Sequence, residues 1–84
     1  MDLHDNQLES LPDTLSELTR LTRLNLGHNR LTALPRAIYS LKELQVLQIN
    51  NNQIESIEDK ICEVNMLNNL NLAHNKIKVN NFIN

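Results

Sequence analysis

The chain has 84 residues, of which 40% are hydrophobic and 2% aromatic, and its formal net charge at pH 7 is −2. This composition indicates one small folded domain with an aliphatic core and argues against intrinsic disorder. The sequence has no basic cluster, no long apolar run and no leader in which basic residues precede apolar ones. We therefore expect no nucleic-acid partner, no membrane partner and no secretory signal.

Four asparagines recur at a fixed interval. Asn6, Asn29, Asn52 and Asn75 follow one another every 23 residues. Each is surrounded by aliphatic residues in the pattern L-x-x-L-x-L-x-x-N-x-L, and only the first set lacks its leading leucine. A constant period of this length predicts a stack of structural repeats.

Taken in chain order, each repeat is expected to begin with a short strand. Alternate side chains of L-x-L point to opposite sides, so the two aliphatic residues face the core and the residue between them faces outward. The strands are predicted to pair in a parallel sheet, about 4.8 Å apart. The asparagine that follows stands where the chain turns inward, and its amide can hydrogen-bond buried main-chain groups of that turn.

The return half of each repeat is expected to be helical. Aliphatic residues spaced by three or four predict short helices over residues 12–18, 35–41 and 58–64. Proline suits a first helical position, which Pro12 and Pro35 would occupy. Two pairs are expected to cap the helix starts, Ser10 with Asp13 and Ser56 with Asp59.

The aliphatic motif, with the pairs Leu11-Pro12 and Leu34-Pro35, resembles the leucine-rich repeat family over nearly the whole chain. The 23-residue form is similar to intracellular Ras-suppressor and scaffold proteins and to bacterial repeat proteins, although Glu58 replaces the proline in the third repeat. The resemblance implies one α/β domain over residues 1–84. That domain would be a right-handed superhelical solenoid with a concave parallel sheet and convex helices. Its stacked asparagine ladder would consist of Asn6, Asn29, Asn52 and Asn75.

The resemblance further implies a protein-binding module, because members of the family present the concave face to a protein partner. The candidate contacts are the outward residues near the middle of that face: Arg23, Asn25, His28, Gln48 and Asn71. The alternative is a solvated face without a partner, since this surface is rich in amides and has no tryptophan or tyrosine anchor.

Catalysis and metal binding are not expected. His28 and His74 lie two repeats apart, which places them about 10 Å from each other, too far for one metal ion. Asp5 lies one repeat from His28 and is expected to form a weak ion pair with it. No serine or cysteine has a base beside it, so we expect no enzyme activity and no cofactor.

The two ends of the stack have no evident capping element, which repeat proteins usually need. The fourth repeat breaks off after Ile77, and Phe82 is expected either to cover the last coil or to fray. Two interpretations stay open: a chain that covers an end by forming a homodimer, or a segment of a larger signalling or effector protein. The single cysteine, Cys62, favours a reducing, cytoplasmic compartment.

Overall fold

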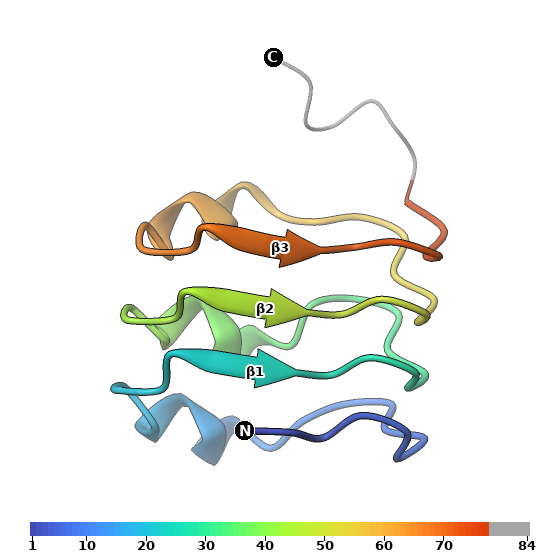
Figure 1. Cartoon of the computed structure of the whole chain (residues 1–84), viewed down its shortest axis with the longest axis horizontal. Helices are drawn as coiled ribbons and strands as arrows, with labels where there is room; N and C mark the ends of the chain where they lie inside the picture. The colour runs from blue at the N-terminus through green and yellow to red at the C-terminus, as the bar shows by residue number, and fades with distance from the viewer. Residues whose placement is uncertain (78–84) are drawn as a thin grey trace.

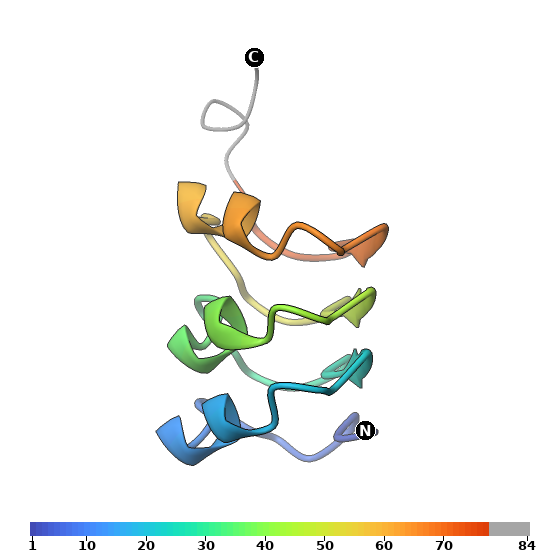
Figure 2. The same cartoon turned by 90° about the vertical axis from the view of Figure 1, so that its left-hand side faces the viewer.

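A computed structural model of the chain describes residues 1–77 and shows a stack of similar coils (Figure 1). Three strands, β1 (Arg23–Asn25), β2 (Val46–Gln48) and β3 (Asn69–Asn71), form a parallel sheet in that order. Three short 3₁₀ helices, η1 (Asp13–Glu17), η2 (Arg36–Ser40) and η3 (Asp59–Glu63), alternate with them along the chain. The strands lie on one side of the stack and the 3₁₀ helices on the other (Figure 2).

The sheet register repeats the sequence period. Leu24 pairs with Leu47, and Leu47 pairs with Leu70, so residues 23 positions apart stand side by side. Residues 1–22, which we call the N-terminal coil, extend this pattern by an isolated bridge between Asp2 and Asn25. The main-chain N–H of Leu3 donates to the carbonyl of Asn25 at 2.8 Å. The expected parallel arrangement of short strands is therefore present.

The core lies between the sheet and the 3₁₀ helices and is almost wholly aliphatic. Nine side chains are completely buried, and all belong to the middle of the stack: Leu24, Leu26, Leu31, Ile38, Leu41, Leu44, Leu47, Ile49 and Ile54. Complete burial of one such side chain stabilises the fold by about 1.5–3 kcal/mol. The fold therefore depends chiefly on the second and third coils.

The expected return helices are present as 3₁₀ helices of five residues, each one residue shorter at both ends than the expected ranges 12–18, 35–41 and 58–64. Each uses i to i+3 bonds, as in the 3.1 Å bonds from Leu15 N to the Pro12 carbonyl and from Ile38 N to the Pro35 carbonyl. A 3₁₀ helix rises about 2.0 Å per residue and is stable only in short runs. It therefore crosses the width of a coil with fewer residues than an α-helix.

The expected capping pairs do not form. The N-cap positions are Pro12, Pro35 and Glu58, and none of the three helices has a side-chain cap hydrogen bond. Each proline thus precedes its helix in an extended conformation, with ψ near 146° at Pro12 and 141° at Pro35, rather than occupying the first helical position. A serine two residues before such a cap is outside the helical turn that it was expected to close.

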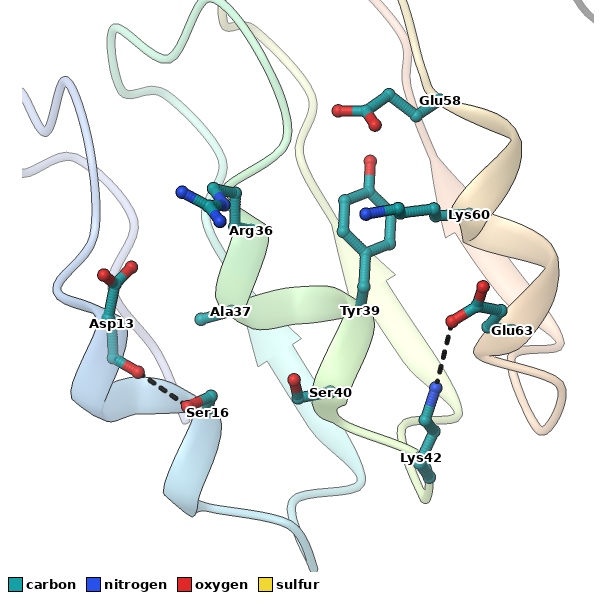
Figure 3. A pocket seen from close by; sticks show the side chains of 10 residues that line it. All are labelled: Asp13, Ser16, Arg36, Ala37, Tyr39, Ser40, Lys42, Glu58, Lys60 and Glu63. Carbon is teal, nitrogen blue, oxygen red and sulfur yellow. Dashed lines mark hydrogen bonds and ion pairs between the residues drawn. The ribbon is translucent and has the colours of Figure 1, made fainter.

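One aromatic side chain is buried on the 3₁₀ side of the stack. Tyr39 stands where η1 has Ser16 and η3 has Cys62, and it is only 8% exposed. Its ring projects from η2 toward η3, with its hydroxyl near Glu58 and Lys60 (Figure 3). Burial raises the pKa of Tyr39, the charge of Glu58 raises it further, and a backbone hydrogen bond from Glu58 opposes this.

The described residues end at Ile77, which is half-buried against the core. The expectation that Phe82 covers the last coil or frays concerns residues 78–84, which lie outside the described part of the chain.

Candidate protein-binding surface

The outward side chains of β1, β2 and β3 form a surface that we call the sheet face. Strand pairing sets them in two rows across the three strands: Arg23, Val46 and Asn69, then Asn25, Gln48 and Asn71. Arg23 and Asn69 are exposed, and the other four are half-buried. Four of the five candidate contact residues therefore lie together on one sheet, and His28 follows β1 by three residues.

Asn25 and Asn71 have a structural role at the carboxyl ends of their strands. The Oδ1 atom of Asn25 accepts the main-chain N–H of Gly27 at 2.9 Å, and Oδ1 of Asn71 accepts that of Ala73 at 3.1 Å. Asp2 accepts the N–H of His4 in the same way at 3.2 Å. These are Asx turns, which a short acceptor side chain closes over two residues. The fold alone thus explains why these positions are Asp or Asn.

Gln48 occupies the same row without this role. Its side chain forms no hydrogen bond within residues 1–77, and its extra methylene makes it too long for an Asx turn. No Asx turn follows Gln48, and Nδ2 of Asn50, two residues later, donates to Oδ1 of Asn51 at 2.9 Å. The structure therefore provides no internal reason for glutamine at position 48, which keeps it as a candidate contact.

Gly27 makes room for the amide of Asn50. A Cβ atom at Gly27 would lie 2.9 Å from Oδ1 of Asn50 and 3.2 Å from Oδ1 of Asn25. Those distances are shorter than normal contacts, so a larger residue would displace two polar side chains at once. The glycine has a negative φ, so the constraint is space rather than backbone conformation.

The backbone conformation at His28 accounts for the type of residue found there. It has a φ of 55°, and the equivalent residues Asp5, Asn51 and His74 have φ values of 61°, 59° and 59°. Asn, Asp and His are the side chains that tolerate this left-handed region best. The residue type at position 28 is thus what the turn requires, and it carries little information about a ligand.

The expected ion pair between Asp5 and His28 is absent from the structure. The Oδ2 atom of Asp5 lies 3.4 Å from Nε2 of its neighbour His4, whose Nδ1 hydrogen-bonds Asp2. This hydrogen bond and the charge of Asp2 raise the pKa of His4, and the hydrogen bonds from His4 lower the pKa of Asp2. Asp5 therefore lies beside the adjacent His4 rather than His28 of the next coil.

The asparagines that end each motif hydrogen-bond main-chain groups of two neighbouring coils. Asn29 accepts the N–H groups of Asn6 and Leu8, both at 2.9 Å, and donates to the carbonyls of Leu3 and Leu26. Asn52 and Asn75 accept the N–H groups of Leu31 and Ile54, each at 3.0 Å. Asn6 donates only within its own coil. These amides hold successive coils together rather than face a ligand.

The opposite side of the stack has a shallow, charged depression between the 3₁₀ helices (Figure 3). Its rim combines cations and carboxylates from all three helices, and Lys42 lies 3.5 Å from Glu63. Both partners are exposed, so this pair adds little stability. Because positive and negative groups alternate here, the depression has no preference for a ligand of one charge.

No group of three metal-ligating side chains occurs within residues 1–77. In the same part of the chain, no helix has both the length and the apolar character needed to cross a bilayer.

The stacked coils, their parallel sheet and their asparagine bonds define a repeat solenoid of short strands and 3₁₀ helices. A family model described as leucine-rich repeat matches residues 20–77, and the chain belongs to this family. The chain is also similar to the solved structure of a leucine-rich repeat protein from Leptospira interrogans, with 34% sequence identity and a TM-score of 0.86. That match covers 90% of this chain and 19% of the other, so the chain spans about a fifth of that protein's length.

Proposed function

We propose that the chain is a protein-interaction module that binds a protein partner across the sheet face, on the concave side of a right-handed solenoid. The observation that carries this is the sheet face itself. Arg23 and Gln48 lie on neighbouring strands, diagonally across the two rows, and neither side chain forms a hydrogen bond or ion pair within the described residues. Exposed polar groups that the fold does not use are available to a partner.

The candidate contact residues differ in how far the fold already explains them. Arg23 and Gln48 come first, because nothing in the fold requires them. Asn25 and Asn71 come second, since their oxygens are engaged and only their NH₂ groups remain free. His28 comes last, because its left-handed turn accounts for it.

The direct test compares two matched variants of the chain in a binding assay with an isolated partner. Arg23→Glu reverses the charge on the sheet face, and Arg36→Glu makes the same change on η2, on the opposite side. We expect binding to fall at least tenfold in the first variant and to be unchanged in the second, with both variants folded by circular dichroism. Equal binding by all three proteins would remove the sheet face from the interface.

A second candidate function is self-association, or stacking within a larger signalling or effector protein. The observation that favours it is the N-terminal coil, where Leu3, Leu8 and Leu11 are half-buried although their equivalents Leu26, Leu31 and Leu34 are buried. Leu18 is 41% exposed and lines an apolar hollow beside Met1 and Leu21. A homodimer through this end would cover these side chains.

Light scattering at high micromolar concentration tests the homodimer. A dimer that becomes monomeric in Leu18→Arg supports it, whereas a monomeric parent chain contradicts it. The match covers 19% of the similar Leptospira protein, which supports the alternative of a segment within a larger protein.

Three narrower points belong to the same proposal. The chain forms one domain without catalytic activity, which accords with the role of its repeated aliphatic and asparagine residues in packing and in main-chain hydrogen bonds. The exposed free thiol of Cys62 supports a reducing, cytoplasmic location.

A further inference from the structure

The acidic residues of the chain are unevenly distributed around the stack. The chain has 10 Asp and Glu residues and 8 Lys and Arg residues. None of the 10 falls within residues 22–30, 45–53 or 68–76, which comprise the strands and the turns that follow them. The carboxylates lie instead in the N-terminal coil and in the return segments, so the small net charge hides a segregation of charge.

The strand segments contain cations in place of carboxylates. Arg23 is exposed on the sheet face and has no ion-pair partner within residues 1–77. Arg30 and Lys76 follow the turns of the first and third strands, although Arg30 shares a shallow hollow with Glu9. Arg23 is thus the cation on the sheet face whose charge is free to meet a partner.

The amides of the sheet face add hydrogen-bond donors to this charge. In Asn25 and Asn71 the oxygen accepts a main-chain N–H, which leaves the NH₂ group as the outward-facing part. The neighbouring Gln48 can present either end. Because adjacent strands are about 4.8 Å apart, these donors form a short row with a spacing set by the sheet.

We propose that the sheet face binds an acidic, acceptor-rich segment of a protein, with carboxylates of the partner placed against Arg23 and against the NH₂ groups of Asn25 and Asn71. Charge-assisted hydrogen bonds to carboxylates are about twice as strong as neutral ones. Within β1, β2 and β3 and the turns that follow them, an acidic partner meets no like charge. The nearest carboxylate is that of Asp2, which pairs with Asn25 at the N-terminal end of the row and is engaged with His4. This inference rests on the proposed function and specifies the chemistry of the partner.

A protein segment fits this face better than a nucleic acid does. Phosphate backbones are bound by several clustered cations, and each neutralised phosphate needs one. The sheet face offers Arg23 alone among its six outward strand residues. Amide donors that flank a single cation match a peptide in which carboxylates alternate with main-chain carbonyls.

Selection of peptides from a random 12-residue display library tests the inference. The full chain is attached through Cys62, its only cysteine, which lies in η3 on the side opposite the sheet and leaves the sheet face open. We expect the selected peptides to be enriched in Asp and Glu and depleted in Lys and Arg. Their affinity is expected to fall at least tenfold with Arg23→Glu, severalfold with Arg23→Gln and not at all with Arg36→Glu.

The outcomes separate this inference from the proposed function. Peptides that lose binding with Arg23→Glu or Gln48→Lys but show no acidic enrichment would overturn the acidic partner and leave the sheet face as the binding surface. Peptides that are insensitive to both substitutions would overturn both proposals. A fluorescent 12-nucleotide single-stranded DNA that binds more tightly than every selected peptide would overturn the assignment to a protein segment.

Discussion

The Oδ1 atom of Asn52 accepts the main-chain N–H of Leu31 at 3.0 Å, although the two residues are 21 positions apart. The NH₂ group of Asn52 donates to the carbonyls of Leu26, Ile49 and Asn50. One buried side chain thus satisfies main-chain groups of two successive coils, which have no access to water.

Replacement of Asn52 by alanine leaves these groups unpaired, and each buried unsatisfied group costs about 1–3 kcal/mol. We expect Asn52→Ala to lower the free energy of unfolding by about 3 kcal/mol. Asn6→Ala is the matched control, because Asn6 is exposed and its side chain bonds only within its own coil. Urea denaturation measures both variants, and equal losses would contradict the role given to coil-to-coil bonds.

Substitutions at His28 distinguish the requirement of the turn from contact with a ligand. Since φ is 55°, glycine is expected to stabilise the chain slightly, whereas valine adds left-handed strain of about 1–2 kcal/mol. Thermal unfolding of His28→Gly and His28→Val measures this difference. Partner binding by His28→Gly should match that of the parent chain, and a large loss of affinity without a loss of stability would make His28 a contact after all.

The buried hydroxyl of Tyr39 makes stability depend on alkaline pH. The pKa of Tyr39 is raised in the folded chain, so the folded state binds its proton more tightly than the unfolded state does. This contribution is complete below the unfolded pKa near 10 and is lost as the pH rises through the folded pKa. Urea midpoints above pH 9 should therefore fall with pH in the parent chain.

Tyr39→Phe is the control for this behaviour. It keeps the ring between η2 and η3 but has no ionisable group, so its urea midpoint should fall less steeply above pH 9. At neutral pH it should cost about 1 kcal/mol, whereas Tyr39→Ala should cost about 3–5 kcal/mol because it opens a cavity. A parent chain and a Tyr39→Phe variant with identical alkaline profiles would show that Tyr39 is not buried as described.

The N-terminal coil is expected to be best ordered at mildly acidic pH. The pKa of Asp2 is lowered, so its contribution is present above pH 3.8 and is lost as the pH falls further. The pKa of His4 is raised, so its contribution is present below pH 6.5 and is lost as the pH rises through the folded value. The amides of Leu3 and Asp5 bond to the carbonyls of Asn25 and Gly27, and their protection against hydrogen exchange, relative to the intrinsic rate, should be greatest between these limits. His4→Gln should remove the rise in exchange above pH 6.5, beyond the intrinsic increase that base catalysis causes.

The stacking of this fold could be predicted from the sequence, because its cause is the 23-residue period. Alternating aliphatic residues identify the inward side of each strand, and the constant interval sets the register of Leu24, Leu47 and Leu70. The 3₁₀ form of the returns could not be predicted, since two or three aliphatic residues spaced by three or four fit both helix types. The burial of the Tyr39 ring could not be predicted either, because the equivalent positions hold Ser16 and Cys62 and form no aliphatic pattern.

The position of the candidate contacts on the sheet follows from the repeat pattern, but the structural roles of three of these residues do not. Asn25, Asn71 and His28 looked like ligand contacts because they are polar and face outward. Their polarity serves Asx turns and a left-handed turn, which depend on local backbone geometry rather than on periodicity. A comparison down each row would have found part of this, since Asp5, His28, Asn51 and His74 all belong to the class that tolerates positive φ.

Site-specific photo-crosslinking of the full chain tests the central claim most directly. A photoreactive side chain is placed at Gln48 on the sheet face or at Lys60 on η3, each with and without Arg23→Glu. We predict that a protein partner is crosslinked from position 48, that this adduct is lost with Arg23→Glu, and that position 60 gives none. Partner adducts from position 60 alone, or adducts from position 48 that persist with Arg23→Glu, would contradict binding across the sheet face.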